Sequence, residues 1–309
     1  MRTTIPAEIE ADIRKAVRLE CWTIAWMISI ITLIGLAMGS SQAMKTAWVE
    51  DVLSLVPALV FLLALHFERK PPTGRFPYGY HRVNSLAFLV SAVALAVMGA
   101  LLLFESLHSL AIADHVTIPP VDLFGRDVWL GWLMIAALAY SVIPPMILGY
   151  MKLPVARRLQ DKVLHTDALM QKADWMTGLA GIAGILGIGL GYWWADSVAA
   201  GIISFSILKD GVTALAIAVA ELADGAPRRL GSTRIEAEAE ALRARLSELY
   251  PGARVRLRES GRFIQAQVCG VASPGKVDLD ALWPGKPERS WRFAQLSFAP
   301  PQDEKETAA

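Results

Sequence analysis

Residues 46–65 read TAWVEDVLSLVPALVFLLAL, an apolar stretch long enough to cross a bilayer that nevertheless carries two adjacent carboxylates, Glu50 and Asp51. A second stretch, residues 164–194, reads LHTDALMQKADWMTGLAGIAGILGIGLGYWW and carries two aspartates. An ionised carboxylate at membrane depth is costly unless it faces a protein interior or water, so these residues indicate ion or proton sites. The alternative is that they lie at the membrane interface, within reach of water. Because two separate stretches show the same feature, we favour the site.

The composition predicts a membrane protein. Of the 309 residues, 54% are hydrophobic, and the mean hydropathy is +0.41. At a rise of about 1.5 Å per residue, six apolar runs are each long enough to cross a hydrocarbon core of about 30 Å. The fifth run is the least apolar because its first turn is polar. The six spans are expected at about residues 20–40, 46–66, 84–108, 128–151, 167–192 and 195–220.

Lysine and arginine are distributed unevenly between the two sides of these spans. The N-terminal segment and the loops after the second and fourth spans contain many of them, Lys152 included, whereas the opposite loops contain only Lys45 and Arg126. The positive-inside rule therefore predicts that both termini and the basic loops are cytoplasmic, which agrees with an even number of spans. We expect an integral protein of a bacterial inner or plasma membrane.

Several classes of function find no support in the sequence. Two cysteines, Cys21 and Cys269, make neither a disulfide framework nor a thiolate metal cluster. The net charge of +1 indicates no nucleic-acid partner. A phosphate loop, a nucleophile motif and a zinc-binding HExxH helix are all missing, so an enzyme is not expected.

The residue composition of the chain changes near residue 226, after which no run is long and apolar enough to span a membrane. An amphipathic pattern predicts a helix, and alternating apolar residues predict three strands, with a short helix before the last strand. The result is a small α+β domain over residues 226–300, followed by a polar tail at 301–309 that we expect to be disordered. In chain order the elements are expected at about 233–249, 254–258, 262–268, 277–282 and 290–298.

Two motifs connect these parts to a known family. Residues 69–87 read RKPPTGRFPYGYHRVNSLA between the second and third spans, and residues 192–208 read YWWADSVAAGIISFSIL between the fifth and sixth. With six spans and a C-terminal α-β-β-α-β domain, the chain resembles the cation diffusion facilitator family of metal/proton antiporters. The resemblance implies a transport domain over residues 1–225 and a ferredoxin-like cytoplasmic domain. It also implies a homodimer, a divalent metal ion and protons as substrates, and no cofactor.

The resemblance implies that this chain has a tetrahedral metal site shared by its second and fifth spans. On the second span it has two residues four apart, and a count without gaps back from the motif at Phe76–Tyr80 places them at Glu50 and Ser54. A slip of one residue would place them at Asp51 and Leu55 instead. Glu50 and Asp51 therefore remain alternative ligands.

On the fifth span the family pattern is His and then Asp, four residues apart. The aspartate corresponds to Asp174, but the histidine position holds Met170, a departure from the pattern. Imidazole and carboxylate suit tetrahedral zinc, whereas a thioether favours soft metals and oxygen ligands favour harder ones, so the set names no single metal among zinc, manganese, iron and cobalt. The expected metal residues are Glu50, Asp51, Ser54, Met170 and Asp174.

Further polar residues indicate a path for protons. Four residues of the fifth span have the spacing of one helical stripe: Asp167, Met170, Gln171 and Asp174. If this stripe faces the carboxylates of the second span, repulsion and desolvation favour proton binding, although Met170 and Gln171 are as readily explained as packing residues. His165 is either a relay or a solvated histidine at the interface. Asp210 either forms an ion pair within the sixth span or lines the path.

Two functions fit these patterns. The first is a homodimeric transporter that exports a divalent metal from the cytoplasm in exchange for protons. The second is a membrane scaffold or assembly partner with the same fold, whose metal site has degenerated at Ser54 and Met170. Residues 226–309 contain no histidine, so we expect the C-terminal domain to dimerise rather than to sense metal. The buried carboxylates favour the transporter, because a scaffold has no need of them.

Overall fold

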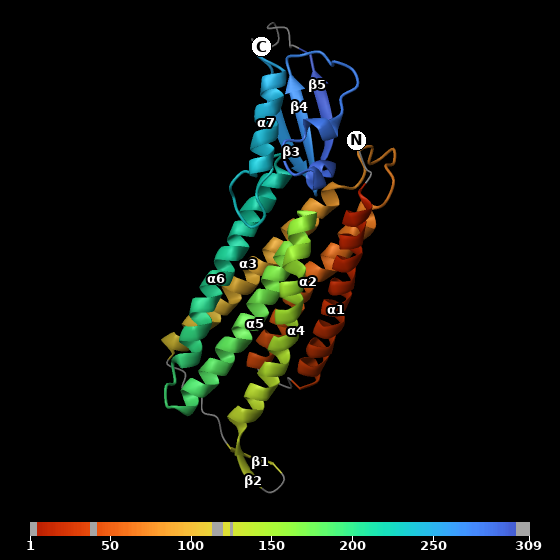
Figure 1. The fold of residues 1–309 in the computed structure, drawn as a ribbon. Coiled ribbons are helices and arrows are strands. Elements are labelled where there is room, and N and C mark those ends of the chain that lie inside the picture. The colour runs from red at the N-terminus through yellow and green to blue at the C-terminus, as the bar shows by residue number, and fades with distance from the viewer. Residues whose placement is uncertain (1–4, 38–41, 113–119, 124–125, 301–309) are drawn as a thin grey trace.

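The structure is a computed structural model that describes residues 5–37, 42–112, 120–123 and 126–300. Long helices dominate its first two thirds and run roughly side by side (Figure 1). A small α+β domain follows them at one end, and both the N-terminus and the C-terminus lie at that end. The helices are α1 (Ala7–Ala37), α2 (Gln42–Glu68), α3 (Arg82–Ala111), α4 (Leu130–Leu159), α5 (Lys162–Gly189) and α6 (Ala195–Leu222).

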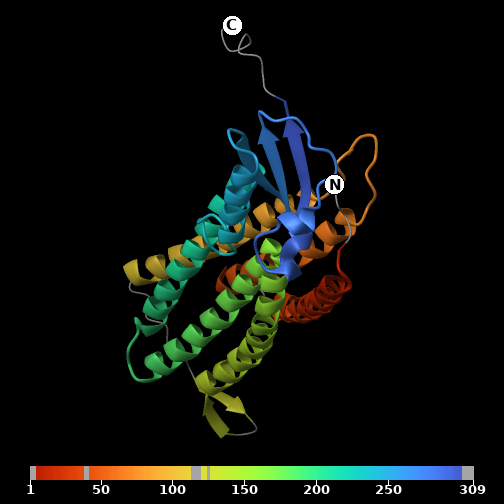
Figure 2. The same ribbon diagram turned by 45° about the horizontal axis from the view of Figure 1, so that its top comes forward.

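Small residues allow α3 and α6 to pack closely along their length. A Cβ atom added at Gly99 would lie 2.6 Å from the backbone nitrogen of Leu208, and one added at Gly211 would lie 2.6 Å from the backbone of Ala96. No larger residue fits at either position without moving a helix, as is common where membrane helices contact each other. Among the other helices, α1 packs against α2 and α4, and α5 packs against α4 (Figure 2).

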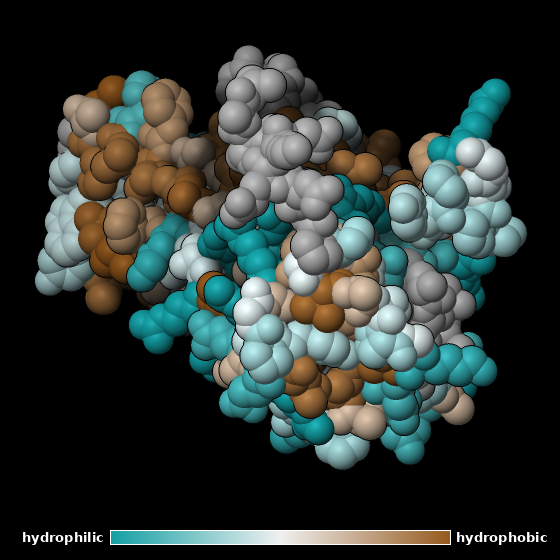
Figure 3. Space-filling view, turned by 90° about the horizontal axis from the view of Figure 1, so that it is seen from above, coloured by the Kyte–Doolittle hydropathy of each residue, from teal (hydrophilic) through white to brown (hydrophobic). Residues whose placement is uncertain are grey.

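Within the part of the chain that the structure describes, five of the six long helices contain a segment long and apolar enough to cross a membrane, and α5 does not. The low apolarity of α5 fits its position, because it packs against α2, α3, α4 and α6 and is therefore largely covered by protein. Hydrophobic side chains gather on the side of the molecule where α3 and α6 lie, at the left of Figure 3. Large exposed apolar side chains on the helices include Trp22, Leu33, Leu36, Phe104, Ile202 and Phe205.

The C-terminal domain has one three-stranded sheet in the order β3-β4-β5. β3 is antiparallel to β4, and β5 is parallel to β4. Helix α7 packs on the sheet through Leu242 and Leu246, which share an apolar core with Ile264 and Phe293. The predicted fold class, six long helices followed by a small α+β domain, is confirmed. The elements are α7 (Ala237–Leu249), β3 (Arg254–Ser260), β4 (Phe263–Cys269), α8 (Leu279–Leu282), a 3₁₀ turn (Pro287–Arg292) and β5 (Phe293–Ala299).

Several element boundaries differ from the sequence-based expectation. Strands β1 (Pro120–Leu123) and β2 (Arg126–Trp129) form a hairpin that was not predicted, so α4 begins two residues later than expected. Helix α5 begins five residues earlier than expected, because Asp161 caps it by accepting a hydrogen bond from the Leu164 backbone at 2.8 Å. Helix α7 begins later than expected, because the preceding residues pair back on the chain in a bridge between Arg228 and Ile235.

Candidate metal and proton site

The second and fifth helices meet at Ser54 and Asp174, which are 120 residues apart in sequence. The Ser54 hydroxyl donates a hydrogen bond of 2.7 Å to Oδ1 of Asp174, and it lies 3.6 Å from the sulfur of Met98. Ser54 is buried and Asp174 is partly buried. The structure therefore brings together one residue from each half of the site that the family pattern implies.

Glu50 and Asp51 lie about one turn before Ser54 on α2, and both are partly buried. Both are close enough to Asp174 for their charges to interact. Within the described residues, Oε1 of Glu50 is buried and has no hydrogen-bond partner. Glu105 of α3 also lies within electrostatic reach of Glu50, and sequence reasoning missed it because no motif surrounds it. Glu50 and Asp51 therefore lie near Asp174 in the partly buried part of α2, whereas Glu105 is exposed on α3.

Met170 lies one turn before Asp174 on α5 and is fully buried. It belongs to an apolar cluster with Leu95, Met98 and Ile207, so its environment is that of a packing residue. Among the described residues, no three His, Cys, Asp or Glu side chains come together as a metal-binding group in this conformation. The role of Met170 as a ligand stays a prediction.

The polar stripe of α5 divides between two neighbourhoods. Asp167 pairs with Lys152 of α4, and the same ammonium lies 2.9 Å from Oε2 of Glu20 of α1. Gln171 donates a hydrogen bond of 3.2 Å to the Thr23 hydroxyl. Asp167 and Gln171 thus contact α1 and α4, whereas Asp174 contacts α2.

The expectation that Lys152 lies in a basic loop is wrong. Helix α4 continues to Leu159, and the side chain of Lys152 is 0% exposed. A lysine can be buried in this way because two carboxylates, Glu20 and Asp167, compensate for its lost hydration. Sequence reasoning did not single out Glu20, although it lies at the start of the first apolar run.

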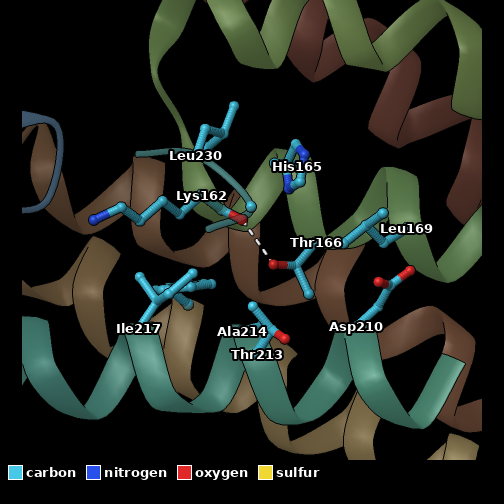
Figure 4. A pocket seen from close by; sticks show the side chains of 11 residues that line it. Lys162, His165, Thr166, Leu169, Asp210, Thr213, Ala214, Ile217 and Leu230 are labelled. Carbon is cyan, nitrogen blue, oxygen red and sulfur yellow. Dashed lines mark hydrogen bonds between the residues drawn. The ribbon is translucent and has the colours of Figure 1, made fainter. Parts of the chain in front are cut away.

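His165 and Asp210 line one cavity of about 180 Å³ between the first turns of α5, the middle of α6 and the segment at Leu230–Gly231 (Figure 4). His165 is partly buried there rather than fully solvated. Asp210 forms an ion pair of 3.6 Å with Lys172 of α5, so the ion pair considered for it joins two helices. Whether either residue relays protons stays a prediction.

A second buried network joins the C-terminal domain to the helix ends. The ammonium of Lys162 lies 2.6 Å from Glu221 of α6 and 2.5 Å from Glu259 of β3. Between β3 and β4, the guanidinium of Arg262 lies 2.6 Å from Asp161 and 3.2 Å from Glu68. Burial lowers the pKa of Arg262, but these two carboxylates outweigh burial and raise its pKa above the usual value. Arg262 therefore stays charged, and its ion pairs with Asp161 and Glu68 join the C-terminal domain to the helix ends.

These features define an integral membrane protein with carboxylates gathered between its helices. Residues 22–223 match the cation efflux transmembrane domain family, which covers more than half of the chain. The chain therefore belongs to the cation diffusion facilitator family, and the resemblance inferred from its motifs is confirmed.

Similar proteins include metal transporters of bacteria. The manganese efflux system protein MneS of Bacillus subtilis is 24% identical over 183 residues, which is 59% of each chain. The zinc transporter ZitB of Escherichia coli is 29% identical over 200 residues, 64% of this chain and 59% of that protein. The putative transporter MamV of Paramagnetospirillum magneticum is 24% identical over 250 residues, 81% and 69% respectively. The chain thus spans about three fifths of the length of MneS and ZitB.

Proposed function

We propose that the protein exports a divalent metal cation from the cytoplasm in exchange for protons and works as a homodimer in a bacterial plasma membrane. The observation that carries this proposal is the contact between Ser54 and Asp174, with Glu50 and Asp51 nearby, inside the helical bundle. A carboxylate site between two membrane helices suits a cation that must lose most of its water on entry. Both termini lie at one end of the molecule, and the excess of basic residues in the segments there supports a cytoplasmic position for that end.

The ligand chemistry favours a hard cation. Because Met170 packs in an apolar cluster, the groups available at the site are the Ser54 hydroxyl and carboxylate oxygens. Oxygen ligands with bound water suit manganese or iron(II), whereas zinc prefers nitrogen and sulfur beside carboxylate. Manganese, the metal that MneS exports, and zinc, the metal that ZitB transports, both lie within the proposed class of substrate. We propose manganese or iron(II) ahead of zinc.

Reconstitution in proteoliposomes with an imposed pH gradient tests this function. We expect uptake of manganese or iron(II) that is faster with the gradient than without it, measured beside zinc, cobalt and cadmium. Glu10→Gln is the matched control, because Glu10 is an exposed carboxylate of α1 that pairs only loosely with Arg14, at 3.7 Å. That variant should transport like the wild type.

The alternative function predicts a different result. If the protein is a scaffold with a degenerate site, none of the metals will move, although the protein is folded and dimeric. Such a result would overturn the transport proposal. A metal flux that does not depend on the pH gradient would support transport but would overturn the proposal of exchange for protons.

Restoring the family pattern should change the metal preference. In the double variant Ser54→Asp with Met170→His, a carboxylate and an imidazole replace a hydroxyl and a thioether, which gives zinc the ligands it prefers. We expect zinc transport relative to manganese to rise by about 10-fold or more, measured as initial rates in the same liposomes. A ratio that does not change would show that these two positions do not contact the metal.

A further inference from the structure

The fully buried charges between α1, α4 and α5 do not balance. Glu20, Lys152 and Asp167 have side chains that are 0% exposed, and two carboxylates share one ammonium. Two negative charges and one positive charge leave one net negative charge in the interior. An unbalanced buried charge is strongly unfavourable, and the ordinary response of a protein is to bind a proton there.

The hydrogen bonds of this cluster are also incomplete. Among the described residues, three buried oxygens have no donor: Oε1 of Glu20, Oδ1 of Asp167 and Oε1 of Gln171. While the carboxylates are ionised, all three oxygens can act only as hydrogen-bond acceptors, so none of them can donate a hydrogen bond to another. A proton on one carboxylate converts an acceptor into a donor, which removes the net charge and supplies one missing hydrogen bond in the same step.

We propose that Glu20, Lys152 and Asp167 form a proton-binding site that is separate from the Ser54–Asp174 site. One proton from water binds to a free carboxylate oxygen of Glu20 or Asp167 and gives a carboxylic acid, and its release restores the carboxylate. Lys152 stays an ammonium throughout and keeps the site at one exchangeable proton rather than two.

Other charged groups nearby belong to different clusters. Among the described residues, the charges that act most strongly on Glu20 are those of Asp167 and Lys152. On α2, Glu50 and Asp51 face Asp174, and Glu50 also faces Glu105 of α3. On the α5–α6 side, Lys172 and Asp210 pair with each other, and His165 faces Arg157 and Asp210.

The proton-binding site is close enough to Asp174 for a bound metal to affect proton binding there. This coupling rests on the proposed function. Asp167 and Asp174 are seven residues apart on α5, a separation of about 10 Å along the helix. The charge of Asp167 acts on Asp174. A dication bound at Asp174 would therefore favour release of the proton from Glu20 or Asp167, which is the direction that exchange requires.

Infrared difference spectroscopy of the metal-free, full-length protein in lipid tests the site without any transport. We expect a carboxylic-acid C=O band that grows on acidification and shifts in deuterated water. Glu20→Gln should remove the intensity of one carboxyl group, and so should Asp167→Asn. Each variant keeps a one-to-one ion pair with Lys152, so each should fold. Lys152→Met should have the opposite effect and increase the band, because both carboxylates then need protons.

Two controls separate this site from its neighbours. Glu10→Gln should leave the spectrum unchanged, and Asp174→Asn should retain the part of the band that Glu20→Gln removes. If Glu20→Gln and Asp167→Asn both leave the band unchanged, the cluster is a permanently ionised structural ion pair and the proposal is overturned. Because no metal is present, this outcome is independent of whether the protein transports one.

Discussion

Asp174→Asn is expected to abolish metal transport and to leave the protein folded. The amide has nearly the same shape as the carboxylate, and its oxygen can still accept the 2.7 Å hydrogen bond from Ser54. What the variant loses is the negative charge that holds a dication. Removing groups that only support a metal ligand costs about 10–100-fold in affinity or activity, so removing a ligand itself should cost more than about 100-fold. Initial rates of metal uptake in proteoliposomes measure the effect.

Ser54→Ala provides the matched comparison for Asp174→Asn. It removes the hydroxyl and leaves the Asp174 carboxylate in place, so we expect a smaller loss, of about 10-fold. Glu50→Gln and Asp51→Asn, measured together, decide which of the two carboxylates serves the site, because only the ligand should show the large loss. Transport by Asp174→Asn at the wild-type rate would mean that the metal path does not pass through Asp174.

Much of the fold could be predicted from the sequence, because the features that determine it are local. Runs of apolar residues mark the six helices, and alternation marks the strands of the C-terminal sheet. The hairpin of β1 and β2 was missed because its pattern of apolar residues is too short. Each strand has only four residues, and the second contains Arg126 and Asp127 beside two apolar residues. Such short polar strands form through their turn and their partner, which no periodicity reveals.

The site was predicted less completely, because its contacts join distant parts of the chain. The pairing of the second and fifth helices near Ser54 and Asp174 came from the family pattern and not from periodicity. Lys152 was predicted to lie in a basic loop, because counting lysines and arginines on the two sides of a membrane treats each of them as exposed to solvent. Its burial depends on Glu20, which is 132 residues away in sequence. Only the packing of α1, α4 and α5 brings these charges together.

Lys162→Met should strongly destabilise the junction between the helices and the C-terminal domain. The ammonium of Lys162 is bonded to Glu221 at 2.6 Å and to Glu259 at 2.5 Å, and all three side chains are at most 7% exposed. Removing one member of a buried ion pair leaves an unpaired charge and costs about 3–5 kcal/mol. The free energy of unfolding in detergent measures this loss, and proteolysis of residues 223–236, which connect α6 to α7, should become faster.

A double-mutant cycle distinguishes the ion pair from simple loss of packing. Lys162→Met combined with Glu221→Gln removes one charge of each sign, and Glu259 keeps its ion pair with Arg292 at 3.3 Å, so part of the lost stability should return. Arg158→Met is the control, because Arg158 is 57% exposed in its pair with Asp12, and a pair of that kind contributes about 0–1 kcal/mol. If Lys162→Met costs no more than Arg158→Met, the junction does not depend on buried charge, and the apolar contact of Phe263 with Trp291 and the helix ends must hold the domain in place.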